Sequence, residues 1–285
     1  MRRRPPAQAG KFYPATERAV RTKIQESFLH PLGPGRIPPK GTTMNDRTVG
    51  LIVPHAGYDY SGPVAAHGYY ALGLSGVNHS AIILGPNHTG LGTGVSTMVE
   101  GEWSTPLGDV PVDTELAKRI IDESGLIDVD ETAHKYEHSI EVQLPFLQFL
   151  YPAKFSFVPI CMMLQDLQTS LEIGRAVAKA AKQHRAVVIA SSDWTHYEPQ
   201  EEAVMKDKEA LQAAIQMDER KFQKVIEEKG VSACGYGPVT ALIQAAKILG
   251  ATKPRLLSHQ TSGDITGDTG AVVGYAAATF EKTNE

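Results

Sequence analysis

Three histidines and an aspartate directly follow apolar stretches of the sequence, where buried strands would end. His55 comes after "VGLIV" and one proline, and His88 comes after "SAIILGPN". Asp193 and His196 come after "AVVIASS". In open α/β sheets, ligands bind beyond the carboxyl ends of the strands, where the connecting loops gather. These four residues are therefore candidates for one site.

Two more residues that could bind a metal or take part in catalysis lie where helices are expected to begin. His138 lies within "HKYEHSIEVQLPF", and Cys234 lies within "ACGYGPV". Two neutral imidazoles and a thiolate suit zinc, iron(II) or copper and leave a position for water or substrate. A carboxylate beside a histidine could act as a general base or fix a ligand's tautomer. Cys234 and a distant histidine could instead form a nucleophilic pair, and the spacing alone leaves both kinds of site open.

Each candidate also has a purely structural explanation. A lone histidine at a strand end is more often a hydrogen-bonded structural residue than a ligand. Asp193 could cap a following helix, and Cys234 could be a small buried hydrophobe. Ser139 is predicted to cap the next helix, with Glu137 and Glu141 as acids favoured near its first turn. The recurrence of such residues at successive loop positions favours a functional site.

Composition and missing motifs exclude several classes of function. The 285 residues carry a net charge of −4, and the sequence lacks the clustered basic residues that a nucleic-acid-binding surface needs. No apolar run approaches the ~20 residues of a membrane span, and two cysteines fit a reducing cytoplasm. The sequence contains no P-loop, no H-E-x-x-H and no G-x-S-x-G, and "GLGTG" lacks dinucleotide-binding spacing. We therefore expect a soluble cytoplasmic protein that binds neither nucleic acid nor membrane.

The elements that must position these residues alternate along the chain. Short apolar, β-branched runs predict strands near 49–53, 80–85, 154–160, 186–193 and 271–280. Longer patterns predict helices near 16–30, 61–73, 113–124, 139–150, 166–183, 200–216 and 237–249. This alternation predicts one α/β domain, residues 1–285, with a mixed, mostly parallel central sheet flanked by helices. A hairpin around "TPLGD" (105–109) predicts an antiparallel or mixed edge, and 31–48 is predicted as a Pro/Gly-rich loop.

Five stretches, in this order, resemble the Memo family, and any one of them alone would be a weak signal. They are "PHAGYDYSG" (54–62), "LGPNH" (84–88), "EHSIEVQLPFL" (137–147), "SSDWTHY" (191–197) and "CGYGP" (234–238). The opening "RPPAQAGKFYP" also resembles the family's start, so the resemblance covers nearly the whole chain.

The resemblance implies a fold like that of class III extradiol dioxygenases, in which two histidines and a glutamate hold non-haem iron. The two histidines fall on His55 and His88, and Cys234 takes the carboxylate position. The implied cofactor is iron or copper, with zinc also a candidate. A thiolate is softer than a carboxylate and favours copper or zinc relative to the dioxygenase iron site. Dioxygenase activity is therefore in doubt.

Two functions follow from the resemblance. The first is a metal-dependent redox protein, with Asp193 and His196 as acid–base residues and with His138 and Tyr58 at the pocket wall. The second is a non-catalytic binding module that recognises a peptide or small ligand through the same pocket. A hydrolase with a cysteine nucleophile is a third hypothesis. The family's association with radical-SAM and AMMECR-type proteins implies such partners.

The two cysteines are expected to differ. Cys161 closes an apolar run, so burial should raise its thiol pKa and leave it inert. Cys234 precedes a predicted helix and should be a thiolate when a metal is bound.

Overall fold

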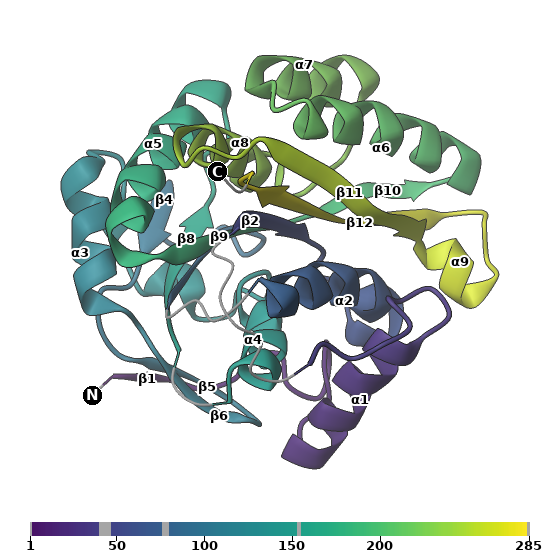
Figure 1. Ribbon diagram of the computed structural model, residues 1–285, viewed down its shortest axis with the longest axis horizontal. Helices are drawn as coiled ribbons and strands as arrows, with labels where there is room; N and C mark the ends of the chain where they lie inside the picture. Colours follow the sequence, from purple (N-terminus) through teal and green to yellow (C-terminus); the bar gives the residue numbers. More distant parts are fainter. Residues whose placement is uncertain (1, 40–46, 76–79, 153–154, 284–285) are drawn as a thin grey trace.

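Figure 1 shows the computed structural model of the chain, which describes residues 2–39, 47–75, 80–152 and 155–283. These residues form a nine-stranded sheet in the order β10-β12-β2-β9-β3-β8-β4-β7, with β11 also paired to β12. The strands are β2 (Thr48–Val53), β3 (Ser80–Pro86), β4 (Val95–Thr97), β7 (Asp128–Val129), β8 (Ser156–Met162), β9 (Ala186–Ser191), β10 (Asp193–Glu198), β11 (Lys253–Thr261) and β12 (Val272–Glu281).

The centre of the sheet is parallel. Strands β2, β9, β3 and β8 run side by side in one direction. Strand β12 pairs antiparallel with β2, β10 and β11, and β4 pairs antiparallel with β8. The predicted mixed, mostly parallel sheet is therefore confirmed, and the carboxyl ends of its central strands point to one edge.

Helices cover both faces of the sheet (Figure 1). They are α1 (Glu17–Leu29), α2 (Tyr58–Leu74), α3 (Thr114–Glu123), α4 (Leu144–Leu150), α5 (Leu167–His184), α6 (Gln200–Ile215), α7 (Glu219–Lys229), α8 (Tyr236–Ile248) and α9 (Ser262–Thr266). Side chains of Thr16, Asp113, Asp166 and Asp218 accept from backbone N–H groups in the first turns of α1, α3, α5 and α7. Among the described residues, no helix is both long and apolar enough to cross a membrane.

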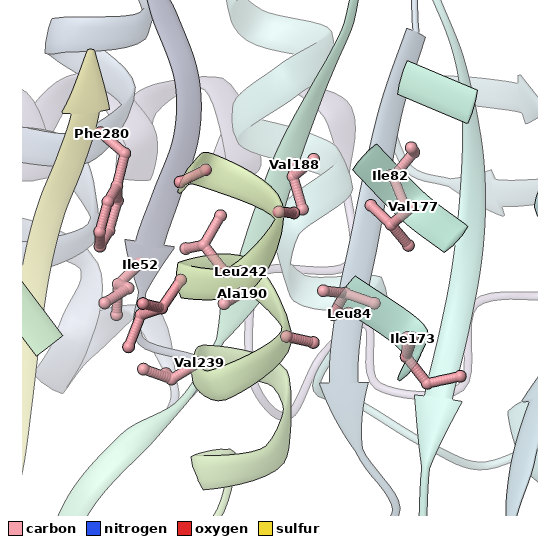
Figure 2. Close-up of a cluster of buried hydrophobic side chains, with 14 of the residues drawn as sticks. Ile52, Ile82, Leu84, Ile173, Val177, Val188, Ala190, Val239, Leu242 and Phe280 are labelled. Atoms are coloured by element: carbon pink, nitrogen blue, oxygen red, sulfur yellow. The ribbon is translucent and has the colours of Figure 1, made fainter. Parts of the chain in front are cut away.

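Side chains of alternate residues in the central strands pack into two buried hydrophobic clusters, one on each face of the sheet. On one face, Ile52, Leu84 and Val188 pack with Leu242 of α8 and Ile173 of α5 (Figure 2). On the other face, strand residues pack against α1, α2 and α4. Each fully buried aliphatic side chain contributes about 1.5–3 kcal/mol, so burial on both faces fixes the strands in register. The rigid sheet then holds the loops at its carboxyl edge.

Several predicted elements differ from the structure. The hairpin of β5 (Glu102–Thr105) and β6 (Gly108–Pro111) forms, but in a separate three-stranded sheet with β1 (Arg3–Arg4). The sequence patterns did not predict α7 or β11. Of the predicted loop 31–48, residues 31–39 are turns and irregular backbone, β2 begins at Thr48, and 40–46 lie outside the described residues.

The predicted helix 139–150 forms only from Leu144 onward, and the alternative explanation of Asp193 as a helix cap was wrong. Ser139 Oγ donates to the Pro86 carbonyl instead of capping a helix, and a 3₁₀ turn at Glu141–Gln143 precedes α4. Asp193 begins strand β10 because "DWTHYE" pairs antiparallel with β12. Pairing with β12 therefore decided the Asp193 segment, whereas the helix signal of 139–150 was correct for its second half.

A buried ion pair fastens the N-terminal segment to the body of the protein. Arg4 donates to Glu141 Oε2 at 2.6 Å and to the carbonyls of His134 and Glu137 at 2.7 and 2.8 Å. Glu141 also accepts from the Tyr13 hydroxyl at 2.6 Å. The side chains of Arg4 and Glu141 are only 6% and 0% exposed, so neither charge has water as an alternative partner.

Glu141→Gln should therefore destabilise the protein strongly, because it leaves the Arg4 charge buried and unpaired. We expect the free energy of unfolding to fall by about 3–5 kcal/mol in urea titrations followed by circular dichroism. Glu17→Gln, which breaks an exposed i,i+4 pair with Arg21, is the control and should cost no more than about 0.5 kcal/mol. Equal effects of the two substitutions would contradict this assignment.

Candidate metal centre

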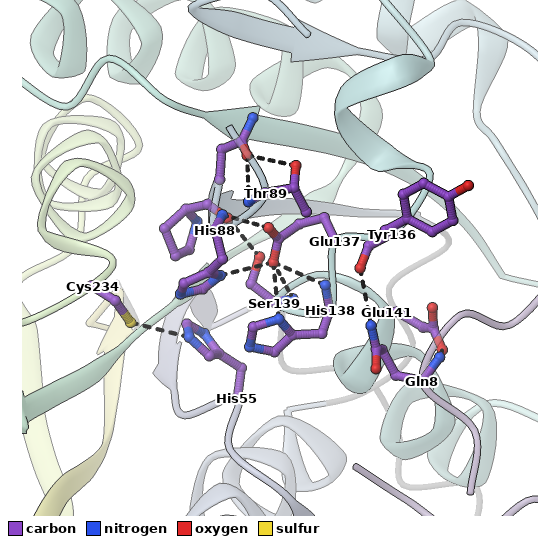
Figure 3. A network of polar contacts seen from close by, with 12 residues as sticks. Gln8, His55, His88, Thr89, Tyr136, Glu137, His138, Ser139, Glu141 and Cys234 are labelled. Carbon is purple, nitrogen blue, oxygen red and sulfur yellow. Dashed lines mark hydrogen bonds and ion pairs between the residues drawn. The ribbon is translucent and has the colours of Figure 1, made fainter. Parts of the chain in front are cut away.

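Three residues that are far apart in the sequence meet at the carboxyl edge of the sheet (Figure 3). His55 follows β2, His88 follows β3, and Cys234 lies just before α8. One donor atom from each lies within 4.8 Å of the other two. His55 Nε2 is 3.1 Å from Cys234 Sγ. The three residues could thus hold a metal ion together, as the sequence predicted.

The hydrogen bonds around His55 determine which ring nitrogen carries the proton. Ser191 Oγ lies 2.7 Å from the Ser139 carbonyl, which can only accept, so the hydroxyl proton points there. Gln143 Nε2 donates to Ser191 Oγ at 2.8 Å. His55 Nδ1, 2.9 Å from the same Oγ, must then be a donor. This leaves the Nε2 lone pair of His55 facing Cys234.

The orientation of the Gln143 amide, on which this assignment depends, is itself fixed. Its Nε2 lies 2.9 Å from the Pro54 carbonyl, and a carbonyl cannot donate. Its Oε1 accepts from the Tyr69 hydroxyl at 2.7 Å. The amide therefore cannot be turned over, and Ser191 receives an N–H group.

His88 is oriented in the same way by a buried carboxylate. Glu137 Oε1 lies 2.9 Å from His88 Nδ1, and Oε2 accepts from the backbone N–H of His88 at 2.6 Å. Oε1 also accepts from the N–H groups of His138 and Ser139. Burial alone would raise the pKa of Glu137, but the His88 hydrogen bond and the neighbouring donors lower it to about 2. The ionised carboxylate thus holds the proton of His88 on Nδ1 and leaves Nε2 free.

His88, Glu137 and His138 also bring donor atoms within 4.8 Å of one another. Glu137 already accepts four N–H bonds, so a metal on this second set would have to displace them. We therefore interpret Glu137 as the group that orients His88.

Cys234 is a thiol when no metal is bound. Burial raises its pKa well above the usual range, and the nearby charge of Asp193 raises it further. Its sulfur accepts from the Asp193 N–H at 3.3 Å. Metal binding must therefore displace a proton from this sulfur. Burial also raises the pKa of Cys161, which is fully buried, as predicted for an inert thiol.

Asp193 and His196 lie beside the three donors. Asp193 Oδ1 accepts from the His55 N–H at 2.8 Å, and burial raises the Asp193 pKa to about 6. This carboxyl group can therefore take up or release a proton near neutral pH. His196 Nδ1 lies 2.9 Å from the Ser232 carbonyl, so Nδ1 carries a proton and Nε2 is the ring nitrogen left to exchange one. His196 is close enough to help lower the pKa of His55.

The two residues predicted for the pocket wall have different surroundings. The His138 ring lies 4.4 Å from the His88 ring and 5.3 Å from the His55 ring, which places it beside the donors. Burial lowers the His138 pKa to about 4, so the ring is neutral. Tyr58 donates to the Val142 carbonyl at 2.6 Å and is 4% exposed within the apolar core. A binding role for Tyr58 stays a prediction without a described contact to the donors.

The residues that set the proton positions were missed by the sequence reasoning. Glu137 was interpreted as a helix-dipole acid, and Ser191, Gln143 and Ser232 were not singled out. Glu137 is adjacent to His138 in "EHSIE", which is the one local signal that could have indicated its role. The other residues contact partners that lie 36 to 136 positions away in the sequence. The local spacing of residues carries no information about such contacts.

The fold and the donor set together define an α/β protein with a candidate transition-metal site at the carboxyl edge of its sheet. The chain belongs to the Memo family, whose model, described as Memo-like protein, matches residues 4–279. A MEMO1 family protein of Methanopyrus kandleri is 49% identical over 282 residues, covering 98% of this chain and 99% of that protein. One from Methanocaldococcus jannaschii is 50% identical over 284 residues, covering 97% and 98%.

A solved structure shares the fold at low sequence identity. An uncharacterized protein from Escherichia coli K12 superposes with a TM-score of 0.57 at 15% identity, covering 81% of this chain and 99% of that chain. The α/β architecture is therefore confirmed by comparison.

Binding of a divalent metal should release about one proton, from Cys234. Burial lowers the pKa of His55, so this ring is already neutral and releases none. Because the proton competes with the metal, the apparent affinity should rise about tenfold per pH unit near neutrality. Calorimetric titration in buffers of different ionisation enthalpy measures the proton count. Cys234→Ser should abolish most of the pH dependence, and unchanged proton release in that variant would contradict the thiolate ligand.

Proposed function

We propose that this protein binds one iron or copper ion through His55, His88 and Cys234 and uses it in redox chemistry. The observation that carries the proposal is the convergence of the three donors within 4.8 Å, with both ring protons committed elsewhere. Bound iron or copper would supply one-electron chemistry that side chains cannot perform. Zinc fits the same donors but would restrict the site to chemistry without redox change.

The chain's own residues supply proton handling beside the metal. Asp193, with a pKa of about 6, exists in both protonation states near neutral pH. His196 donates from Nδ1 to the Ser232 carbonyl, so its Nε2 is the nitrogen available for proton transfer. One group that can donate and one that can accept a proton are the parts of a general acid–base pair. This supports the predicted catalytic roles of Asp193 and His196.

Metal content is the first test. Protein purified without a chelator or a metal-affinity tag should carry iron or copper, measured by mass spectrometry, at about one ion per chain. His55→Ala and Cys234→Ser should lose most of it. His67→Ala is the control, because His67 lies on α2 and contacts the Leu32 carbonyl. Equal metal in wild type and His55→Ala would remove the proposed centre.

The second candidate is a binding module that uses the same pocket without catalysis. The observation in its favour is Tyr197, which follows His196 and is 79% exposed. Its backbone has φ of 59°, a conformation that non-glycine residues rarely adopt and that is often found at functional sites. A large exposed aromatic ring, 5.8 Å from the His196 ring, suits contact with a peptide or small ligand.

A fluorescent phosphopeptide separates the two candidates. If the protein is a binding module, the peptide should bind chelator-treated protein. Tyr197→Ala should then weaken peptide binding about tenfold, measured by fluorescence anisotropy. Leu126→Ala, at an exposed position after α3, is the control. Failure of the metal-free protein to bind would count against the module and leave the redox proposal standing.

Cytoplasmic location, which rests on the small number of cysteines, remains a proposal. Partnership with radical-SAM and AMMECR-type proteins, which rests on the family resemblance, is likewise a proposal.

A further inference from the structure

The loop that carries Cys234 must be held in place for its sulfur to face the two histidines. Unlike His55 and His88, which directly follow central strands, Cys234 lies in a turn that leads into α8. Two contacts fix the start of this turn. The Cys234 N–H donates to the Asp193 carbonyl at 3.2 Å, and the Gly235 N–H donates to Ser192 Oγ at 3.0 Å.

A third residue, Gln165, holds both ends of the turn at once. Its Nε2 donates to the Cys234 carbonyl at 2.9 Å, and its Oε1 accepts from the Gly237 N–H at 2.8 Å. Only a side-chain amide offers a donor and an acceptor in this arrangement, because a carboxylate cannot donate and an ammonium cannot accept. Gln165 therefore forms hydrogen bonds with both backbone groups of the turn, which few other residue types could do.

The position of Gln165 is also well determined. Its backbone carbonyl accepts from Ser170 Oγ at 3.2 Å and from Gln223 Nε2 at 3.0 Å, which ties it to α5 and α7. Its side chain lies against Gly237, where an added Cβ would come within 2.7 Å of the Gln165 Cβ. The glycine is thus needed for the close approach of the amide to the turn.

We propose that Gln165 is a positioning residue of the metal centre, fixing the turn so that Cys234 Sγ stays beside His55 Nε2. This inference rests on the proposed metal-binding function. Gln165 touches neither His55 nor His88 through any described hydrogen bond, so its effect should be confined to the sulfur ligand. Loss of the amide should free the turn, and the metal should then keep its imidazole ligands but lose the thiolate.

Cobalt(II) is a suitable probe, because a thiolate ligand gives a near-ultraviolet charge-transfer band and imidazole ligands do not. Gln165→Glu keeps the shape and the acceptor but removes the donor and places a carboxylate against the Cys234 carbonyl. Gln165→Leu removes both hydrogen bonds. We expect both variants to lose most of the band and to bind cobalt(II) about 10- to 100-fold more weakly, the usual cost of removing a group that orients a ligand.

Gln148→Leu is the matched control. Gln148 is another buried glutamine, and its amide accepts from the Thr105 hydroxyl and donates to the Gly108 carbonyl, so its loss removes two comparable hydrogen bonds away from the turn. The control should keep the band and bind cobalt(II) within about twofold of wild type. In metal-free protein, iodoacetamide should alkylate Cys234 faster in the Gln165 variants than in wild type or the control. Cys161, which is fully buried, should remain unlabelled in folded protein and reports any general unfolding.

The outcomes distinguish failure of the proposed metal centre from failure of the positioning role of Gln165. A wild-type protein that binds no cobalt(II), or binds it without the band, removes the proposed centre and with it the role of Gln165. A normal wild-type band that persists in both Gln165 variants overturns the positioning role alone. Equal losses in the Gln165 and Gln148 variants also overturn it, because the effect would then be a general loss of stability. Loss of the band confined to the Gln165 variants supports it.

Discussion

The candidate centre depends on where its ring protons are held. An imidazole can bind a metal only through a nitrogen that carries no proton. Here three histidines donate an Nδ1 proton to different groups: His55 to Ser191, His88 to Glu137 and His196 to the Ser232 carbonyl. The acceptors lie behind the rings, so the lone pairs on Nε2 remain available. Without these hydrogen bonds, each of the three rings could carry its proton on either nitrogen and would be poorly oriented.

The parallel sheet makes this arrangement possible. Adjacent parallel strands deliver their ends to the same edge, so His55, His88 and Ser191 come together although the chain is long. Glu137 reaches the same edge from a segment outside the sheet, and Arg4 holds the Glu137 carbonyl from the N-terminal strand. The buried ion pair between Arg4 and Glu141 thus supports the ligand His88 indirectly, through the backbone of the residue that orients it.

Much of this could be predicted from the sequence, because strand ends and apolar periodicity are local properties. His55, His88 and Cys234 were found as candidates by that reasoning, and the central strands agree with the structure. The functions of Glu137 and Ser191 were not predicted, because each depends on contacts tens of residues away. Strand β10 was not predicted, because its pairing with β12 joins segments that are far apart in the sequence. Local patterns therefore predicted which residues form the site, and long-range hydrogen bonds decided how they are oriented.

The hydrogen bonds that orient the candidate donors have a consequence for when a metal could bind. Both rings and the turn of Cys234 are held by hydrogen bonds to the protein itself. Zinc fingers, by contrast, are unfolded until their metal arrives. A site held in this way could be formed by folding and filled afterwards, at a rate set by the supply of the ion. A thiolate and two imidazoles would also discriminate against the abundant hard cations magnesium and calcium.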